Sequence, residues 1–297
     1  MKINLKVIGE LTLAMIFWAF SFVWVKQAYE SFNPSTVVLF RLILSSSLLY
    51  IILRSLKKLN PLKKGDLKWF LLLAFFEPFL YFVGESFGLQ HVSSTMGAVI
   101  ISTIPLFAPI ADRFFFKTRI TRLNITGLVI SFTGVMMIVF EKDLSQNAPL
   151  NGILMLFLAV LAAVGYTVVL KKIPMHYNAV SIITYQNAIG SLYFLPLFLT
   201  LDLKDFEHTE FKTIPVLAIV QLAIFASSAA FILFTNSIRI IGITKANAFV
   251  NMIPVFTAVF AWWLLDEPLS FGKFAGIGIV IAGVFISQVK RGNIVSG

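Results

Sequence analysis

The chain alternates between long apolar stretches and short polar connectors. A helix needs about 20 predominantly apolar residues to cross the hydrocarbon core of a bilayer, and ten stretches meet this requirement. The longest connectors, 54–68, 141–150 and 202–212, are too short to bury a core of their own. We therefore expect an all-α integral membrane protein with one membrane domain. The ten predicted transmembrane helices are 8–27, 36–54, 67–89, 94–116, 122–140, 151–170, 179–200, 213–236, 244–265 and 272–290.

The apolar pattern is repeated within the chain. Pro105 and Pro254 lie 149 residues apart, and the same offset pairs Gly127 with Gly276 and Gly134 with Gly283. Because each half then holds five predicted helices, an odd number, the second half must enter the membrane in the opposite orientation. The sequence predicts two inverted five-helix repeats, residues 1–145 and 146–297. In the earlier helices an offset of 145 pairs Val23 with Val168, Lys26 with Lys171 and Asn33 with Asn178.

Composition and charge narrow the class of protein. Residues are 58% hydrophobic and only 13% charged, which is too apolar for one water-soluble domain. Of 24 lysines and arginines, 18 fall on the side of the amino terminus, five on the opposite side, and Arg41 inside a span. The positive-inside rule then places both termini in the cytoplasm. The net charge of +10 is spread over helix ends, so we expect a lipid bilayer as partner and no nucleic acid.

Sequence motifs do not favour an enzyme or a cofactor-binding protein. The chain has no cysteine and no HExxH, phosphate-loop or nucleophile-elbow pattern. We expect no catalytic residue, no metal site and no cofactor. A signalling receptor is disfavoured because the chain has an inverted repeat and no output domain.

Two corresponding stretches carry a family resemblance. The first runs from Leu89-Gln90-His91-Val92-Ser93-Ser94-Thr95 to Ile104-Pro105-Leu106-Phe107, and the second from Ile243-Thr244-Lys245-Ala246-Asn247 to Ile253-Pro254-Val255-Phe256. Together with Trp262 to Leu269, they resemble the EamA-type family of the drug/metabolite transporter superfamily. The family closes the fourth helix of each repeat with an acidic residue, which Glu267 matches. In the first half Lys117-Thr118-Arg119 departs from this pattern.

The resemblance implies a ten-helix permease. Such permeases move small metabolites, often amino acids, usually outward across a bacterial cytoplasmic membrane. Two inverted halves around a midplane site can give alternating access. The alternative within transport is a flippase or transporter of a lipid-linked or nucleotide-sugar substrate. Because both halves occur in one chain, we expect that a monomer can suffice.

The paired prolines are candidate hinges. A proline inside a helix leaves the carbonyl four residues earlier unpaired, here those of Ile101 and Val250. We interpret Pro105 and Pro254 as hinges of two helices that line the substrate path. The polar residues preceding the prolines on these helices are Ser102, Asn247 and Asn251, the two asparagines sharing a helical face. The alternative is that proline is simply common in membrane helices.

Glu77 is the sharpest candidate for coupling or substrate binding. It lies near the middle of the third predicted span, with Tyr81 one turn further on. A carboxylate at that depth costs about 2.5–3.5 kcal/mol, so it should face a cavity, be paired or carry a proton. It could couple transport to protons, bind a substrate ammonium group, or be a structural carboxyl bonded to a neighbouring helix.

Other polar and aromatic residues complete the candidate site. Arg41 and Glu85 lie at similar depth, so they could form an ion pair that acts as an outer gate; alternatively Arg41 reaches the headgroups and Glu85 faces water. Trp18 and Tyr166 could stack on a substrate or only pack, and Ser21 could line the path or join helices. The repeated glycines at 127, 134, 276 and 283 predict close packing of the fifth and tenth helices.

Overall fold

The computed structural model describes residues 5–107, 114–115, 122–139, 150–241, 246–268 and 270–288. All regular secondary structure in these ranges is helical, and they contain no β-strand. The all-α prediction is therefore confirmed. Six helical segments are long and apolar enough to cross a membrane: Leu5–Ala28, Pro34–Ser55, Leu67–Leu89, Leu150–Leu170, Ala179–Glu207 and Thr213–Ile241. Shorter apolar helices are Ser94–Phe107, Ile125–Met137, Phe249–Leu265 and Phe271–Ile286. The count of ten spans and their inverted arrangement stay predictions.

The first half of the chain contributes seven elements to the described structure. They are α1 (Leu5–Ala28), α2 (Pro34–Ser55), α3 (Leu67–Ala74), η1 (Phe75–Leu80), α4 (Tyr81–Leu89), α5 (Ser94–Ile101) and α7 (Arg122–Val139). The elements of the second half are α8 (Leu150–Leu170), α9 (Ala179–Leu197), η2 (Phe198–Asp202), α10 (Leu203–Glu207), α11 (Thr213–Gln221), η3 (Leu222–Ala230), α12 (Phe231–Ile241), η4 (Ala248–Met252), α14 (Ile253–Leu265) and α15 (Phe271–Gln288).

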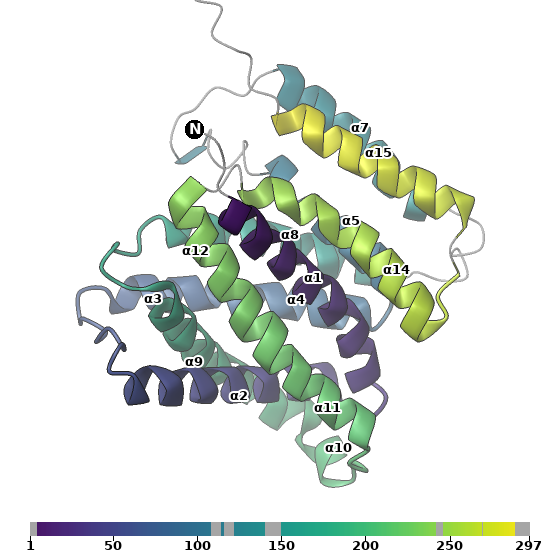
Figure 1. Cartoon of the computed structure of the whole chain (residues 1–297). Helices are drawn as coiled ribbons and strands as arrows, with labels where there is room; N and C mark the ends of the chain where they lie inside the picture. The colour runs from purple at the N-terminus through teal and green to yellow at the C-terminus, as the bar shows by residue number, and fades with distance from the viewer. Residues whose placement is uncertain are drawn as a thin grey trace, which may run out of the picture.

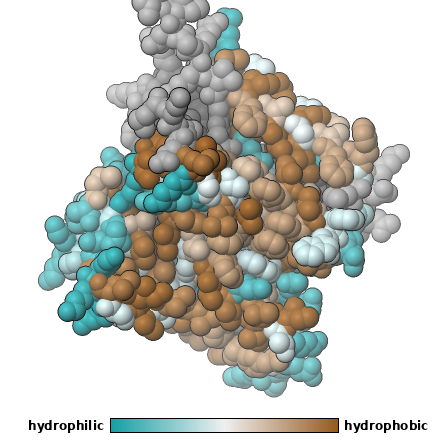
Figure 2. All heavy atoms as spheres, viewed as in Figure 1, coloured by the Kyte–Doolittle hydropathy of each residue, from teal (hydrophilic) through white to brown (hydrophobic). Residues whose placement is uncertain are grey.

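The helices pack between the two predicted halves as well as within them. Helix α1 lies among η3, α11, α12 and α14, α2 packs against α9, and α4 packs against α8 (Figure 1). Buried side chains of these helices form one apolar cluster that includes Leu11, Met15 and Leu42. Many large apolar side chains, such as Ile51 and Leu154, instead point outward. Figure 2 shows them as a broad brown surface with hydrophilic residues gathered toward its margins, as expected of a surface that faces lipid.

Helices α7 and α15 lie side by side at one edge of the molecule (Figure 1). Their close approach depends on glycine. A Cβ added at Gly134 would lie 2.8 Å from the carbonyl oxygen of Gly276, and one added at Gly283 would lie 2.7 Å from that of Gly127. Small residues permit such backbone contact between membrane helices. The predicted packing role of these glycines is confirmed.

Breaks in three helices alter the sequence-based picture. The span Leu67–Leu89 is interrupted at Glu77, which has φ −147° and ψ 118° and precedes a cis peptide bond to Pro78. Helix α5 ends at Ile101, and a turn at 102–103 precedes a short helical segment that contains Pro105. Pro254 stands in the first turn of α14, after the 3-10 helix η4.

These breaks correct the mechanism expected for the prolines. In the first turn of a helical segment, the missing amide of proline removes no intrahelical hydrogen bond. Accordingly, the carbonyl of Val250 is not left unpaired, because it accepts the backbone N–H of Ile253. The prolines therefore follow helix breaks and do not interrupt continuous helices.

Candidate functional site

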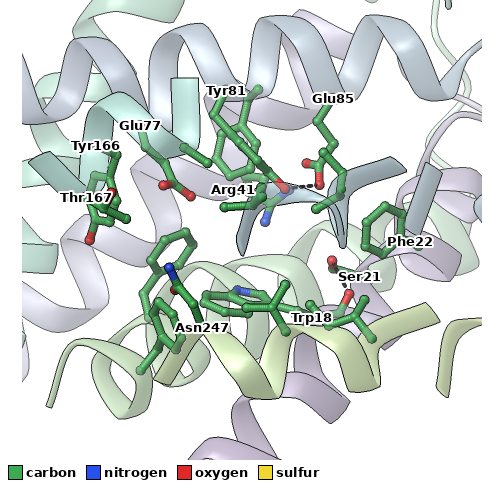
Figure 3. Close-up of a pocket in the computed structure, with 18 residues that line it drawn as sticks. Trp18, Ser21, Phe22, Arg41, Glu77, Tyr81, Glu85, Tyr166, Thr167 and Asn247 are labelled. Atoms are coloured by element: carbon green, nitrogen blue, oxygen red, sulfur yellow. Dashed lines mark hydrogen bonds between the residues drawn. The ribbon is translucent and has the colours of Figure 1, made fainter. Parts of the chain in front are cut away.

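A cavity lies inside the helix bundle where α1, α2, α4, α8 and α12 meet the broken helices (Figure 3). Its volume is about 70 Å³, counted as the positions open to the centre of a water molecule. One water needs about 10–15 Å³ by this measure, so the cavity has room for several waters or for a small polar group. The lining residues are Trp18, Ser21, Phe22, Arg41, Glu77, Tyr81, Phe82, Glu85, Ile101, Ile104, Ala163, Tyr166, Thr167, Phe231, Phe234, Asn247, Val250 and Ile253.

Arg41 is held in the cavity wall by contacts from both predicted halves. Its side chain is 2% exposed. Its Nε donates a hydrogen bond of 2.8 Å to Ser227 Oγ, and its guanidinium lies over the ring of Phe82, 4.3 Å from the ring centroid. Its Nη1 has no hydrogen-bond partner in the described chain. The interpretation that Arg41 reaches the headgroups is wrong, because the bundle encloses it.

Glu85 is bonded to Tyr81 and not to Arg41. Tyr81 Oη donates a hydrogen bond of 2.9 Å to Glu85 Oε1 (Figure 3). The Glu85 side chain is 5% exposed, so it does not face the water outside the bundle. Arg41 and Glu85 line one cavity, yet between these two described residues there is no ion pair within 4.0 Å. The closed ion-pair gate is not present in this conformation.

Glu77 faces the cavity without a protein partner. Its side chain is 7% exposed, and Figure 3 shows its carboxylate turned toward the open space with no hydrogen bond drawn to it. The alternative of a structural carboxyl bonded to a neighbouring helix therefore finds no donor among the described residues.

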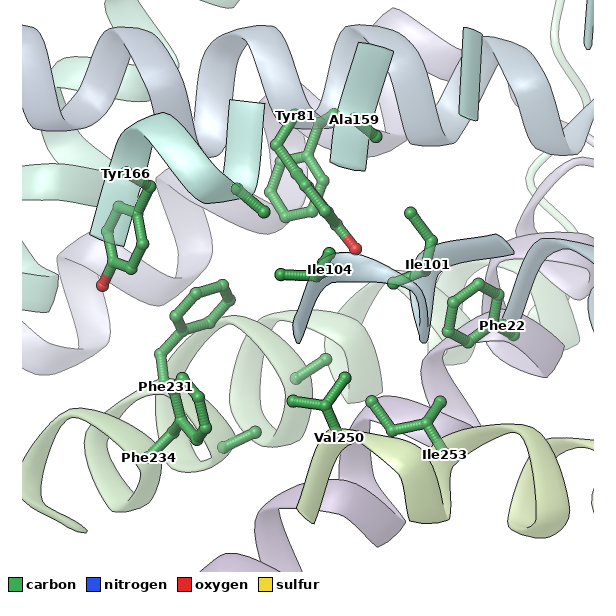
Figure 4. Close-up of a cluster of buried hydrophobic side chains, with 14 of the residues drawn as sticks. Phe22, Tyr81, Ile101, Ile104, Ala159, Tyr166, Phe231, Phe234, Val250 and Ile253 are labelled. Atoms are coloured by element: carbon green, nitrogen blue, oxygen red, sulfur yellow. The ribbon is translucent and has the colours of Figure 1, made fainter. Parts of the chain in front are cut away.

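Aromatic and aliphatic side chains form the opposite wall of the cavity (Figure 4). The Trp18 ring meets Phe231 and Phe234 edge to face, with centroid distances of 5.1 Å and 4.9 Å. Ser21 Oγ donates to the carbonyl of Trp18 at 2.7 Å, so this hydroxyl is satisfied within its own helix. The wall can hold the apolar part of a ligand while the charges lie across from it.

One further polar group at the cavity lacks a partner. Asn247 Nδ2 has no hydrogen-bond partner among the described residues, and Asn247 lines the cavity. Tyr166 also lines it, but its hydroxyl interacts with Thr235 and Gln186. Buried polar atoms are nearly always bonded. Unpaired groups at a cavity are therefore candidates to bind a ligand or water.

Several predicted residues lie away from the cavity. Pro105, Pro254, Ser102 and Asn251 do not line it, and Ser102 Oγ donates to the carbonyl of Val99 at 2.7 Å. The prediction that Asn247 and Asn251 share a helical face is wrong. Residues 248–252 form a 3-10 helix, whose three residues per turn separate positions four apart by about 120°. Asn251 is buried, with its side-chain amide unpaired in the described chain.

Sequence reasoning missed the apolar part of the wall. Phe22, Phe82, Phe231 and Phe234 line the cavity, but in a chain with 31 phenylalanines nothing distinguishes them from lipid-facing ones. Ser227, which bonds Arg41, was also missed, because nothing in the sequence distinguishes it from the other serines of the apolar spans.

In the described chain, His, Cys, Asp and Glu form no group of three that could hold a metal ion.

Two relatives of the chain are uncharacterized transporters by name, and a third is a WAT1-related protein. It is 26% identical over 255 residues to the uncharacterized transporter YetK of Bacillus subtilis (strain 168), covering 84% of this chain and 77% of that protein. An uncharacterized transporter of Archaeoglobus fulgidus is 27% identical over 281 residues, covering 95% and 98%. The WAT1-related protein At3g02690, chloroplastic, of Arabidopsis thaliana is 25% identical over 291 residues, covering 93% and 68%.

A solved crystal structure supports the fold. It superposes with a TM-score of 0.70 over 95% of this chain and 96% of its own, at 12% sequence identity, a likeness that speaks to fold alone. The EamA-like transporter family matches residues 7–140 and, a second time, residues 150–288. This chain, a multi-pass membrane protein whose apolar helices enclose a cavity with charged residues in its wall, belongs to the EamA-like transporter family.

Proposed function

We propose that this protein is a permease that carries small zwitterionic metabolites, such as amino acids, by alternating access. The observation that supports this most is that a cationic and an anionic side chain, neither of them in an ion pair with a described residue, line the same cavity. Arg41 offers an unpaired guanidinium nitrogen and Glu77 an unbonded carboxylate. A ligand with a carboxylate and an ammonium group would complement both. Its apolar side chain would lie against Trp18 and Phe231.

The position of the cavity supports alternating access. Glu77 is ten residues from the start of its span at Leu67, which corresponds to a depth of about 15 Å for a helical rise of 1.5 Å per residue. A site near the midplane of the membrane is typical of transporters built from repeats. Small movements of the surrounding helices can then expose it to either side.

We propose ten membrane spans in two inverted repeats, residues 1–145 and 146–297. Asn33 and Asn178, which the repeat pairs, both precede a helix with almost the same backbone: φ −74° and ψ 160° at Asn33, φ −74° and ψ 158° at Asn178. The helices that follow them, α2 and α9, pack together. This contact supports a two-fold relationship between the halves.

Orientation and direction complete the proposal. The lysines and arginines favour cytoplasmic termini, and the family resemblance favours export across a bacterial cytoplasmic membrane. One chain supplies both repeats, so a monomer is the proposed working unit.

Glu77 is the group proposed to link transport to protons, since a cavity carboxylate without a protein donor is free to exchange a proton with substrate.

The test is uptake into proteoliposomes of a panel of amino acids, amines and nucleosides, each with and without an imposed pH gradient. We expect saturable uptake of amino acids, increased by the gradient. Uptake of amines or nucleosides alone would contradict the zwitterionic substrate. No uptake by protein that elutes as a folded species would favour a lipid-linked or nucleotide-sugar substrate instead.

A further inference from the structure

Two carboxylates of the second half cap the amino termini of helices in the first half. Asp202 Oδ2 accepts the backbone N–H of Thr36 at 2.7 Å and the Thr36 hydroxyl at 3.0 Å, in the first turn of α2. Glu267 accepts the backbone N–H of Ser94 at 2.7 Å and the Thr95 hydroxyl at 2.8 Å, in the first turn of α5. A helix amino terminus presents unpaired N–H groups and a partial positive charge, so each carboxylate joins the halves. We call the end of the bundle where both contacts lie the outer end, after the predicted orientation.

The contact of Asp202 belongs to a helix pair that is fixed at both ends. At the opposite end of α2 and α9, Asn60 Oδ1 accepts the backbone N–H of Asn178 at 2.8 Å. The backbone N–H of Asn60 in turn donates to Ser181 Oγ at 3.0 Å. Asp202 is also only 3% exposed. Separating α2 from α9 would break caps at both ends, so this pair is suited to stay together while other helices move.

The contact of Glu267 joins helices that line the cavity. Ile101 at the end of α5 and Ile253 at the start of α14 both face it. Helix α5 is broken after Ile101, and α14 is preceded by the 3-10 segment η4. The outer segments of both helices are therefore separate rods that can tilt at these breaks. Glu267 holds the outer tip of one rod against the outer tip of the other.

The surroundings of Glu267 allow the contact to open and close. Unlike Asp202, Glu267 is partly exposed, so its carboxylate can exchange protein donors for water at little cost. Lys273 Nζ donates to the carbonyl of Pro268 at 2.6 Å and fixes the loop that carries Glu267. Lys26 Nζ donates to the carbonyl of Leu89 and is the nearby cation that interacts with Glu267.

We propose that the bond between Glu267 and the first turn of α5 is a latch that closes the outer side of the cavity and opens during transport. The proposal rests on the alternating-access function proposed above, and it identifies the bond between Glu267 and α5 as the contact that breaks when the outer side opens. In the repeat register the residue paired with Glu267 is Thr118, so the sequence does not repeat the carboxylate. The α2–α9 pair, capped at both ends, supplies the fixed part against which the latch opens.

The test uses the absence of native cysteine. Ala163, a small residue of the cavity wall, is replaced by cysteine, and a membrane-impermeant methanethiosulfonate reagent labels it in right-side-out and in inside-out membrane vesicles. In this background Glu267→Gln removes the charge of the latch, and Thr95→Val removes one donor. Glu210→Gln, at an exposed acid of the same outer end, is the matched control.

We expect Glu267→Gln to raise the labelling rate in right-side-out vesicles by about tenfold, as for the loss of a hydrogen bond to a charged group. Thr95→Val should raise it by a smaller factor and Glu210→Gln should leave it unchanged. An unchanged rate in both latch variants would overturn the proposal, as would an increase confined to inside-out vesicles. Labelling needs no substrate, so this result is independent of whether amino acids are transported. Thr95→Val keeps the test decisive if Glu267→Gln does not fold.

Discussion

The Tyr81 hydroxyl donates a hydrogen bond of 2.9 Å to Glu85 Oε1, one helical turn further along α4. The bond engages Glu85, while Arg41 is bonded to Ser227 and stacked on Phe82. Glu77 has no hydrogen bond to the residues that line the cavity with it (Figure 3). The three charged groups therefore differ in availability: Glu85 is held, Arg41 is partly held, and Glu77 is open to a ligand.

Replacing Tyr81 with phenylalanine should let Glu85 turn to Arg41. A direct ion pair would then occupy the guanidinium, and we expect affinity for the transported amino acid to fall by about tenfold, as for the loss of one hydrogen bond to a charged group. Equilibrium binding of the radiolabelled amino acid to detergent-solubilised protein measures this. Tyr50→Phe, at an exposed tyrosine of α2, is the control. Undiminished affinity in Tyr81→Phe would show that the Tyr81–Glu85 bond does not control Arg41.

Glu77→Gln should remove both the response to a pH gradient and the preference for an ammonium group. We expect affinity for amines and amino acids to fall by about tenfold or more, while exchange of unlabelled for labelled substrate continues. Uptake into proteoliposomes with and without a gradient distinguishes the two effects. The control is Glu30→Gln, at an exposed acid in the connector after α1. A variant that still responds to the gradient like the native protein would exclude Glu77 as the coupling group.

The sequence predicted the helices better than it predicted their interruptions. Spans such as Pro34–Ser55 follow from the length of the apolar run alone, because a membrane helix must satisfy its own backbone. The break at Glu77 and the 3-10 segment before Pro254 do not follow from composition. They depend on neighbouring helices that accept the irregular backbone, and this information lies far away in the chain.

The polar part of the cavity could be predicted and the apolar part could not. Glu77, Arg41 and Glu85 stood out because ionisable residues are rare within membrane spans, and all three line the cavity. Their partners did not stand out: the ion pair expected between Arg41 and Glu85 is replaced by bonds to Ser227 and Tyr81. Depth along a helix can be read from sequence, whereas the direction of a side chain depends on how helices rotate against one another.

Arg41→Lys should separate the charge of the guanidinium from its geometry. Lysine keeps the charge but lacks the planar fork of donors that binds a carboxylate. We expect affinity for an amino acid to fall by about tenfold, and affinity for the corresponding amine, which has no carboxylate, to change little. Competition binding with both ligands measures the difference. Arg54→Lys, at an exposed position of the same helix, should affect neither ligand. Equal losses for amino acid and amine would mean that Arg41 supports the fold and does not read the carboxylate.

Gly283→Ala should separate α15 from α7. The new methyl group would meet the backbone of Ser131 and Gly127, and rigid backbone cannot move aside as the end of a side chain can. Overpacking of this kind costs about 1–3 kcal/mol, so we expect a lower unfolding temperature in detergent. Gly278→Ala, in the same helix, has nothing within 4 Å of the added methyl group and should be neutral or slightly stabilising, since alanine favours helix. Thermal unfolding followed by size-exclusion chromatography compares the two variants with the native protein. If both variants unfolded at the same temperature, close packing at Gly283 would not contribute to the stability of the α7–α15 pair.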